Sequence, residues 1–236
     1  MRKMVSLLLI GLLLPTFSSA QEWDFKVAPY LWAAGIDGTL TAGQQSGDFS
    51  VGFDDIVNVL DGAIIVRFEA QKGRHGFFGD VVKMNLDPDT GRDGPGGPIG
   101  AEIEALIIEG GYSYGFTDQL AGEIGLTYWD FETSLIPPNL PVAKSSSDWT
   151  DILAGIRYTA EIGAKWESVT RINLATGGAD VVLGLDQSFL REFANGDQLL
   201  LGFRLLNTEY DKHGLAGLEM AIDSTFAGAT IGYVFD

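Results

Sequence analysis

The amino-acid sequence predicts an all-β protein, a closed antiparallel transmembrane β-barrel of about ten strands with one short helix near residues 54–60. Three observations predict this fold: a secretory signal at the start of the chain, strands with alternating apolar and polar residues, and a final strand that ends in aromatic residues. A secreted soluble β-sandwich shows the same alternation, so the first and third observations, with the rhythm of the loops, favour the barrel.

Residues 1–20 have the order of a secretory signal peptide. Two basic residues, Arg2 and Lys3, precede an apolar run over 5–14, and small residues end the segment. The run is shorter than the roughly 20 residues that a membrane-spanning helix needs, and no later run is longer. We therefore expect one mature domain, residues 21–236.

The mature sequence divides into ten expected strands. The first lies around residues 23–42, and Phe49–Gly52 extends an extracellular hairpin. Both ends of a barrel chain lie on the periplasmic side, so the number of strands is even, and eight or twelve stay open as alternatives if residues 38–52 contribute differently. Nine further strands are expected at 62–73, 76–87, 101–115, 120–134, 148–162, 166–176, 181–193, 197–210 and 219–235.

Alternation is clearest in the strand over 148–162. Ile152 and Ile156 fall on one face, whereas Asp151 and Arg157 fall on the other. In a membrane barrel the apolar face contacts lipid and the polar face lines the lumen.

A helical spacing interrupts the strands after residue 52. Two aspartates there suit a helix N-terminus. The helix is either a plug over the lumen or a packing turn that caps one barrel end. Its apolar face consists of Phe53, Ile56, Val57 and Leu60.

The connections alternate between short and long, as periplasmic turns and extracellular loops require. The short set is 73–76, 116–118, 163–165 and 194–197, and the other set is 87–100, 135–147, 176–180 and 213–217.

The last strand carries the pattern of a membrane-insertion signal. Ile231, Tyr233 and Phe235 share one face, and Asp236 departs from the pattern because the aromatic usually ends the chain. We expect this signal to be read by the barrel-assembly machinery, which places the protein in the outer membrane in contact with its lipid. The sequence leaves the oligomeric state undetermined.

The charge and composition of the chain indicate which classes of partner and ligand to expect. The net charge is −17 at pH 7, and phosphate binding needs a basic surface, so we expect no nucleic acid. The chain has no cysteine, and it carries no cofactor motif, so we expect neither a cofactor nor a metal. Asp87–Gly94 resembles a calcium loop in its alternate oxygen ligands, but Arg92 adds a repelling charge and Pro98 stands in place of the final glutamate.

Charged residues recur on the predicted lumenal face. Buried charges must be paired, and arginine pairs well with carboxylates because its planar fork binds both oxygens. Two interpretations stay open: a packed ionic network that fills the barrel, and a narrow passive pore for small solutes or ions that weakly prefers cations. The predicted network is Arg67, Glu69, Glu123, Asp151, Arg157, Glu161, Glu167, Arg171, Asp186, Glu192 and Arg204.

An enzyme is the third hypothesis, a hydrolase or acyltransferase at the extracellular rim. His213 lies near Asp211, Glu219 and Ser224 in sequence, and a carboxylate could orient it as a base. No nucleophile motif accompanies it, so we predict no catalytic residues.

Four segments resemble a group of uncharacterised bacterial outer-membrane barrel proteins, broadly of the OmpA/OmpW-like kind. They are 27–38 (VAPYLWAAGIDG), 53–56 (FDDI), 68–73 (FEAQKG) and 78–82 (FGDVV). The resemblance covers the mature chain in order, implies a small barrel, and brings no activity or functional residues with it.

Overall fold

The protein is built almost entirely of long antiparallel strands. The computed structural model describes residues 23–42, 45–53, 60–86, 89–94, 97–136, 143–213 and 219–236. Its strands are β1 Asp24–Ala42, β2 Gln45–Val51, β3 Leu60–Lys72, β4 His75–Leu86, β5 Asp89–Gly94, β6 Gly97–Gly115, β7 Leu120–Ile136, β8 Ala143–Gly163, β9 Trp166–Thr176, β10 Val181–Glu192, β11 Gln198–His213 and β12 Glu219–Val234.

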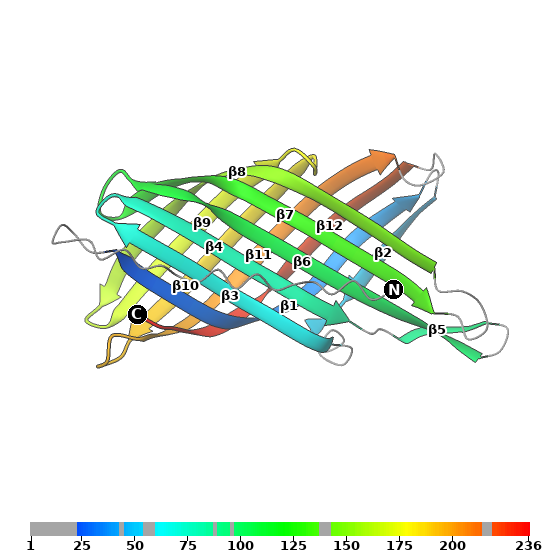
Figure 1. The fold of residues 1–236 in the computed structure, drawn as a ribbon, viewed down its shortest axis with the longest axis horizontal. Helices are drawn as coiled ribbons and strands as arrows, with labels where there is room; N and C mark the ends of the chain where they lie inside the picture. Colours follow the sequence, from blue (N-terminus) through cyan, green and yellow to red (C-terminus); the bar gives the residue numbers. More distant parts are fainter. Residues whose placement is uncertain are drawn as a thin grey trace, which may run out of the picture.

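Ten of these strands close into a barrel (Figure 1). β12 pairs with β1 from Tyr30↔Gly232 to Ala42↔Met220, so the wall has no open seam there. β1 pairs with β3 over Asp24–Pro29 and with β2 from Ile36 onward, so β2 extends the wall on one side. β5 pairs only with β6. The predicted ten-stranded closed barrel is confirmed, and the β-sandwich alternative is wrong because a sandwich keeps its edges.

The strands agree with the predicted ranges, and β9 has the predicted bounds. Two predicted loops are partly wrong, because strand pairing continues into them. β5 and the start of β6 form a hairpin inside 87–100, and β8 begins at Ala143, inside 135–147.

The predicted helix lies almost wholly outside the described residues. Ile56 and Val57 belong to that stretch, 54–59. At its edges, Phe53 is 45% exposed, whereas Leu60 pairs with Leu86 as the first residue of β3 and does not extend a helix. No helix among the described residues is long and apolar enough to span a membrane.

The β3–β4, β6–β7, β8–β9 and β10–β11 turns lie at one end of the barrel, together with the C-terminus (left in Figure 1). The β3–β4 turn has two residues, with Gly73 at φ 59°, and the β10–β11 turn has Gly196 at φ 96°. Glycine adopts these left-handed conformations without the steric cost of a Cβ. Short turns mark the periplasmic end of such barrels, so we call this end the turn end.

The outer wall is apolar. Ile152, Leu31, Ile64 and Ile124 are 64–69% exposed and point away from the interior. Exposed aromatic side chains gather near the turn end, where a girdle anchors a barrel at the lipid–water boundary. They are Trp23, Phe25, Phe68, Phe77, Tyr114, Phe116, Phe193 and Phe235.

The interior is stacked in layers along the barrel axis. On β10, Val182 belongs to a large apolar cluster on the loop side, Asp186 to a charged layer, and Leu190 to a small apolar cluster toward the turn end. The large cluster includes stacked aromatic rings, with Trp129 and Trp149 5.6 Å apart. The lumenal face is thus not only polar, since aromatic and aliphatic side chains fill much of it.

Candidate functional site in the barrel interior

Two arginines share one buried carboxylate in the charged layer. Arg67 Nε lies 3.0 Å from Asp80 Oδ2, and Arg204 Nη1 lies 3.3 Å from Asp80 Oδ1. Tyr30 donates its hydroxyl hydrogen to Asp80 at 2.9 Å and accepts a hydrogen bond from Arg204 at 2.7 Å. Arg67 Nη2 also pairs with Asp186 at 2.7 Å. Both carboxylates are thus fully engaged, as buried charges require.

A second arginine cluster lies beside the first. Arg171 Nη2 lies 3.0 Å from Glu109 and 2.9 Å from Glu123, and its Nε donates to Glu123 at 3.0 Å. Its guanidinium also stacks 4.8 Å from the centre of the Phe78 ring. The three charged side chains are at most 7% exposed. The planar guanidinium of arginine can bind two carboxylates through different N–H groups, an arrangement for which the compact ammonium group of lysine is less suited.

Three ion pairs span the interior from wall to wall. Arg67 on β3 meets Asp186 on β10, and Arg204 on β11 meets Asp80 on β4. Arg157 on β8 meets Glu69 on β3 at 2.9 Å. In each pair the two strands lie four places apart around the ring of ten. We call these three contacts the cross-braces.

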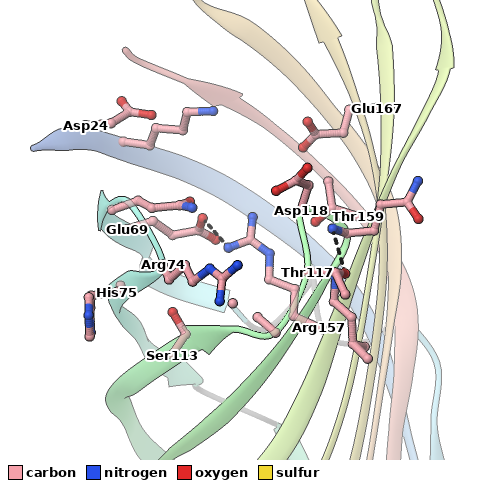
Figure 2. A pocket seen from close by; sticks show the side chains of 17 residues that line it. Asp24, Glu69, Arg74, His75, Ser113, Thr117, Asp118, Arg157, Thr159 and Glu167 are labelled. Atoms are coloured by element: carbon pink, nitrogen blue, oxygen red, sulfur yellow. Dashed lines mark hydrogen bonds and ion pairs between the residues drawn. The ribbon is translucent and has the colours of Figure 1, made fainter. Parts of the chain in front are cut away.

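A polar cavity of about 230 Å³ opens at the turn end (Figure 2). We call it the vestibule. Arg74 and Arg157 point into it in Figure 2. Charges of both signs face one another there, because its carboxylates are Asp24, Glu69, Asp118 and Glu167 and its cations are Lys26, Arg74 and Arg157. A cavity of only about 40 Å³ lies deeper, against the small apolar cluster.

Asp151 binds backbone N–H groups, whereas the other buried carboxylates pair with arginines. It is completely buried and accepts hydrogen bonds from the backbone N–H groups of Gly178 and Ala179 at 2.8 Å each. Trp149 donates its indole N–H to the same carboxylate at 3.1 Å. Asp151 therefore holds the β9–β10 connection over the loop end of the barrel.

The predicted network divides into four groups. Seven of its eleven residues form the ion pairs described above, Asp151 holds the β9–β10 connection, and Glu167 lines the vestibule. Glu161 and Glu192 do not join: both are exposed at strand ends, and no ion pair involves them among the described residues. β8 and β10 continue past the charged layer to the turn end, so residues there are exposed to water even though they continue the polar alternation of the strand.

Three residues of the clusters were not predicted: Tyr30, Asp80 and Glu109. The sequence could have indicated Asp80. The two-residue turn after Lys72 fixes the register of the β3–β4 hairpin, and this register puts Asp80 opposite Arg67. Glu109 stands opposite Asp80 across the next pairing, whose register follows a long connection. Within the described residues, no group of three or more His, Cys, Asp or Glu side chains could hold a metal ion.

A closed antiparallel barrel with an apolar outer wall and an aromatic girdle defines the class of bacterial outer-membrane β-barrel proteins. The outer membrane is accordingly its location. The outer-membrane protease OmpT from Escherichia coli has a similar structure, with a TM-score of 0.50 and 9% identity over 92% of this chain and 99% of that chain.

Two further solved structures are similar in fold. Ail, the attachment invasion locus protein of Yersinia pestis, has a TM-score of 0.42 at 6% identity, over 87% of this chain and 97% of that one. The transport unit of the autotransporter AIDA-I from Escherichia coli has a TM-score of 0.42 at 10% identity, over 98% and 94%. No protein-family description matches the sequence, and no curated protein does. At these identities the likeness shows the fold alone.

Proposed function

We propose that the chain is a structural barrel of the outer membrane whose interior is closed to solutes. The cross-braces carry this proposal. In each cross-brace the paired side chains come from strands four places apart and meet with N···O distances of 2.7–3.3 Å, so they occupy the middle of the barrel. Small barrels fill their interior in this way, whereas water channels appear at 16 or more strands.

The apolar clusters support the same proposal. On the loop side of the charged layer, Trp129 and Leu153 are each 1% exposed. A solute that passed the ion pairs would therefore meet tightly packed rings and aliphatic groups, which offer no partners to a hydrated ion.

Reconstitution into planar lipid bilayers tests the proposal. We expect no stepwise currents from the wild type, once a gel shift on boiling has shown that the protein is folded. A double variant, Arg67→Ser with Asp186→Ser, removes one cross-brace without changing the net charge and is expected to be equally silent or to give small, short openings. Regular stepwise currents from the wild type would overturn the closed barrel.

The second candidate is the narrow, cation-preferring pore. The vestibule favours it, because the cavity opens toward the periplasm and contains four carboxylates. If the wild type does conduct, the reversal potential in a salt gradient reports the preference, and cation selectivity would support this candidate.

We further propose a role without catalysis. Among the residues of the rim hypothesis, Ser224 is 5% exposed and faces the interior, away from a substrate at the rim. His213 pairs with Glu219 in the β11–β12 ladder, and the side chains of both, like that of Asp211, lie outside the described residues. An activity on lipids or peptides that is lost in His213→Ala would contradict this proposal.

The proposed partners are outer-membrane lipid and the barrel-assembly machinery. Ile231 and Phe235 support this, since they are 52% and 49% exposed on the outer face of the closing strand. Replacing both with alanine should slow insertion into vesicles that contain the purified machinery, relative to the same change at Ile152 and Ile156 on β8. Equal slowing would contradict a specific signal.

A further inference from the structure

An apolar groove lies on the outer wall of β6, β7 and β8, near the turn end. Its volume is about 380 Å³. The rings of Tyr112, Tyr114 and Phe116 line it, together with the aliphatic side chains of Ile124 and Ile156. Ile124 and Ile156 are 64% and 49% exposed, so the groove lies in the part of the wall that contacts the bilayer.

Small residues make the groove. Gly122 lies against Phe116, and a Cβ at Gly122 would come within 2.9 Å of the Phe116 ring. Ala154 stands opposite Ile124 on β8 and adds only a methyl group. On a barrel wall that otherwise carries isoleucine, leucine and phenylalanine, this recess leaves room for a chain of methylene groups.

A polar pair lies beside the groove, because Tyr112 lines it and contacts His75, which also lines the vestibule. His75, the first residue of β4, is exposed, and its Nδ1 forms a hydrogen bond of 2.5 Å with the Tyr112 hydroxyl. Its ring also contacts Tyr114 edge-on, at 5.4 Å between centroids. The imidazole Nε2 has no partner among the described residues.

A cation extends the same rim. Lys72 lies over the Trp23 ring at 5.9 Å, and the Trp23, Phe77 and Tyr112 rings continue in steps of 5.9 and 5.7 Å. Two rings thus separate Lys72 from Tyr112, and the His75–Tyr112 pair keeps one free donor, either the His75 Nε2–H or the Tyr112 hydroxyl, in a chain whose net charge is −17. Such a rim is complementary to a phosphate group.

We propose that this groove binds one acyl chain of a phospholipid of the inner leaflet, with the lipid phosphate at His75 and Tyr112. The turn end faces the periplasm, so the His75–Tyr112 pair lies at the depth of the inner-leaflet headgroups. Lipid tails are as apolar as the wall, so the hydrophobic effect does not favour one lipid over another. The preference for the bound lipid comes from close packing in the recess and from the contacts to its phosphate.

A second copy of the chain fits the groove less well. Stable protein interfaces bury about 1,200–2,000 Å² with a well-packed apolar centre. Here a recess of about 380 Å³ lies beside a hydrogen-bonding pair, which the apolar wall of a second barrel would leave unpaired.

Native mass spectrometry of the detergent-purified protein with added phosphatidylglycerol tests the proposal. We expect one tightly retained lipid per wild-type barrel. Ala154→Leu fills the groove and should lose that lipid, while His75→Ala should weaken its retention about tenfold, as a lost hydrogen bond to a charged group does. The matched control is Ala229→Leu, at an outward-facing position on β12, four strands away, which should retain the lipid as the wild type does.

Two further arms separate the alternatives. Diacylglycerol, which has the chains without the phosphate, should be retained less than phosphatidylglycerol by the wild type, and equal retention would overturn the headgroup site. Equal lipid retention in Ala154→Leu and Ala229→Leu would overturn the groove. A wild-type dimer in sedimentation that becomes a monomer in Ala154→Leu would assign the groove to a second copy instead. A gel shift on boiling checks that each variant is folded.

Discussion

Replacing Arg171 with methionine tests how the charged layer contributes to stability. Methionine keeps much of the length of the side chain and removes its charge. Glu109 and Glu123 then lose their only ion-pair partner among the described residues, while they stay 6% and 3% exposed. Breaking a buried pair by removing one partner costs about 3–5 kcal/mol. We therefore expect Arg171→Met to lower the free energy of unfolding by that amount.

Two matched variants separate charge from packing. Lys144→Ala breaks an ion pair with Glu132 in which the side chains are 62% and 41% exposed, and it should cost at most about 1 kcal/mol. Changing Arg171, Glu109 and Glu123 together to methionine leaves no unpaired charge, and should recover most of the loss. The measurement is urea unfolding in phospholipid vesicles at pH 7, with the folded fraction read from gel mobility without boiling and from tryptophan fluorescence.

Either of two results would show that unpaired glutamate charges do not cause the loss of stability. Arg171→Met could be no less stable than Lys144→Ala, which would mean that the two glutamates do not depend on their arginine. The triple variant could be as unstable as Arg171→Met, and the loss would then come from the shape of the arginine and its stacking on Phe78.

Three other predictions concern the barrel as a whole. The unboiled protein should migrate faster on a denaturing gel than the boiled one, and identical mobility would contradict a stable barrel. Leu153→Ala should cost about 2–5 kcal/mol in urea unfolding, because Leu153 is 1% exposed in the large apolar cluster, whereas Ile152→Ala on the lipid face should cost clearly less. The hydrogen bond from Tyr233 holds the pKa of Asp197 below its ordinary value, so Tyr233→Phe should raise that pKa, as followed by NMR of labelled aspartate. A carboxyl with a lowered pKa stabilises the fold above its unfolded-state pKa of about 3.9, and this contribution is lost as the pH falls through the folded-state pKa; an unchanged titration would refute the contact.

The membrane strands could be predicted from the sequence because each has one face in lipid. Ile152 and Ile156 recur at period two beside Asp151 and Arg157, and the structure puts the first pair outside and the second pair inside. β2 was predicted only in part, as the hairpin extension at Phe49–Gly52, and β5 was not predicted. The β5 sequence, DTGRDG, has no alternation, and it is ordered as a strand by its pairing with β6.

The partners of the charged residues could be predicted less well than their positions. Alternation places Arg67 and Asp186 on the inner face, but 119 residues separate them in the sequence. Their contact depends on the strand tilt and stagger with which the barrel closes, and these are properties of the whole ring. Asp80 was missed because apolar residues flank it on the same inner face of β4, Phe78 and Val82, so that face does not look polar.

In the closed barrel that we propose, the order of the interior layers means that any passage needs a conformational change. A solute from the periplasm that enters the vestibule first meets the small apolar cluster around Leu190 and then the Arg67–Asp186 brace. Opening that brace leaves a buried charge without its partner, at about 3–5 kcal/mol, which lowers the population of the open arrangement at least about a hundredfold. The stacked rings of Trp129 and Trp149 lie beyond it and must move as well. These obstacles lie in series, so in the closed barrel that we propose the vestibule is a recess at equilibrium and not the entrance of a channel.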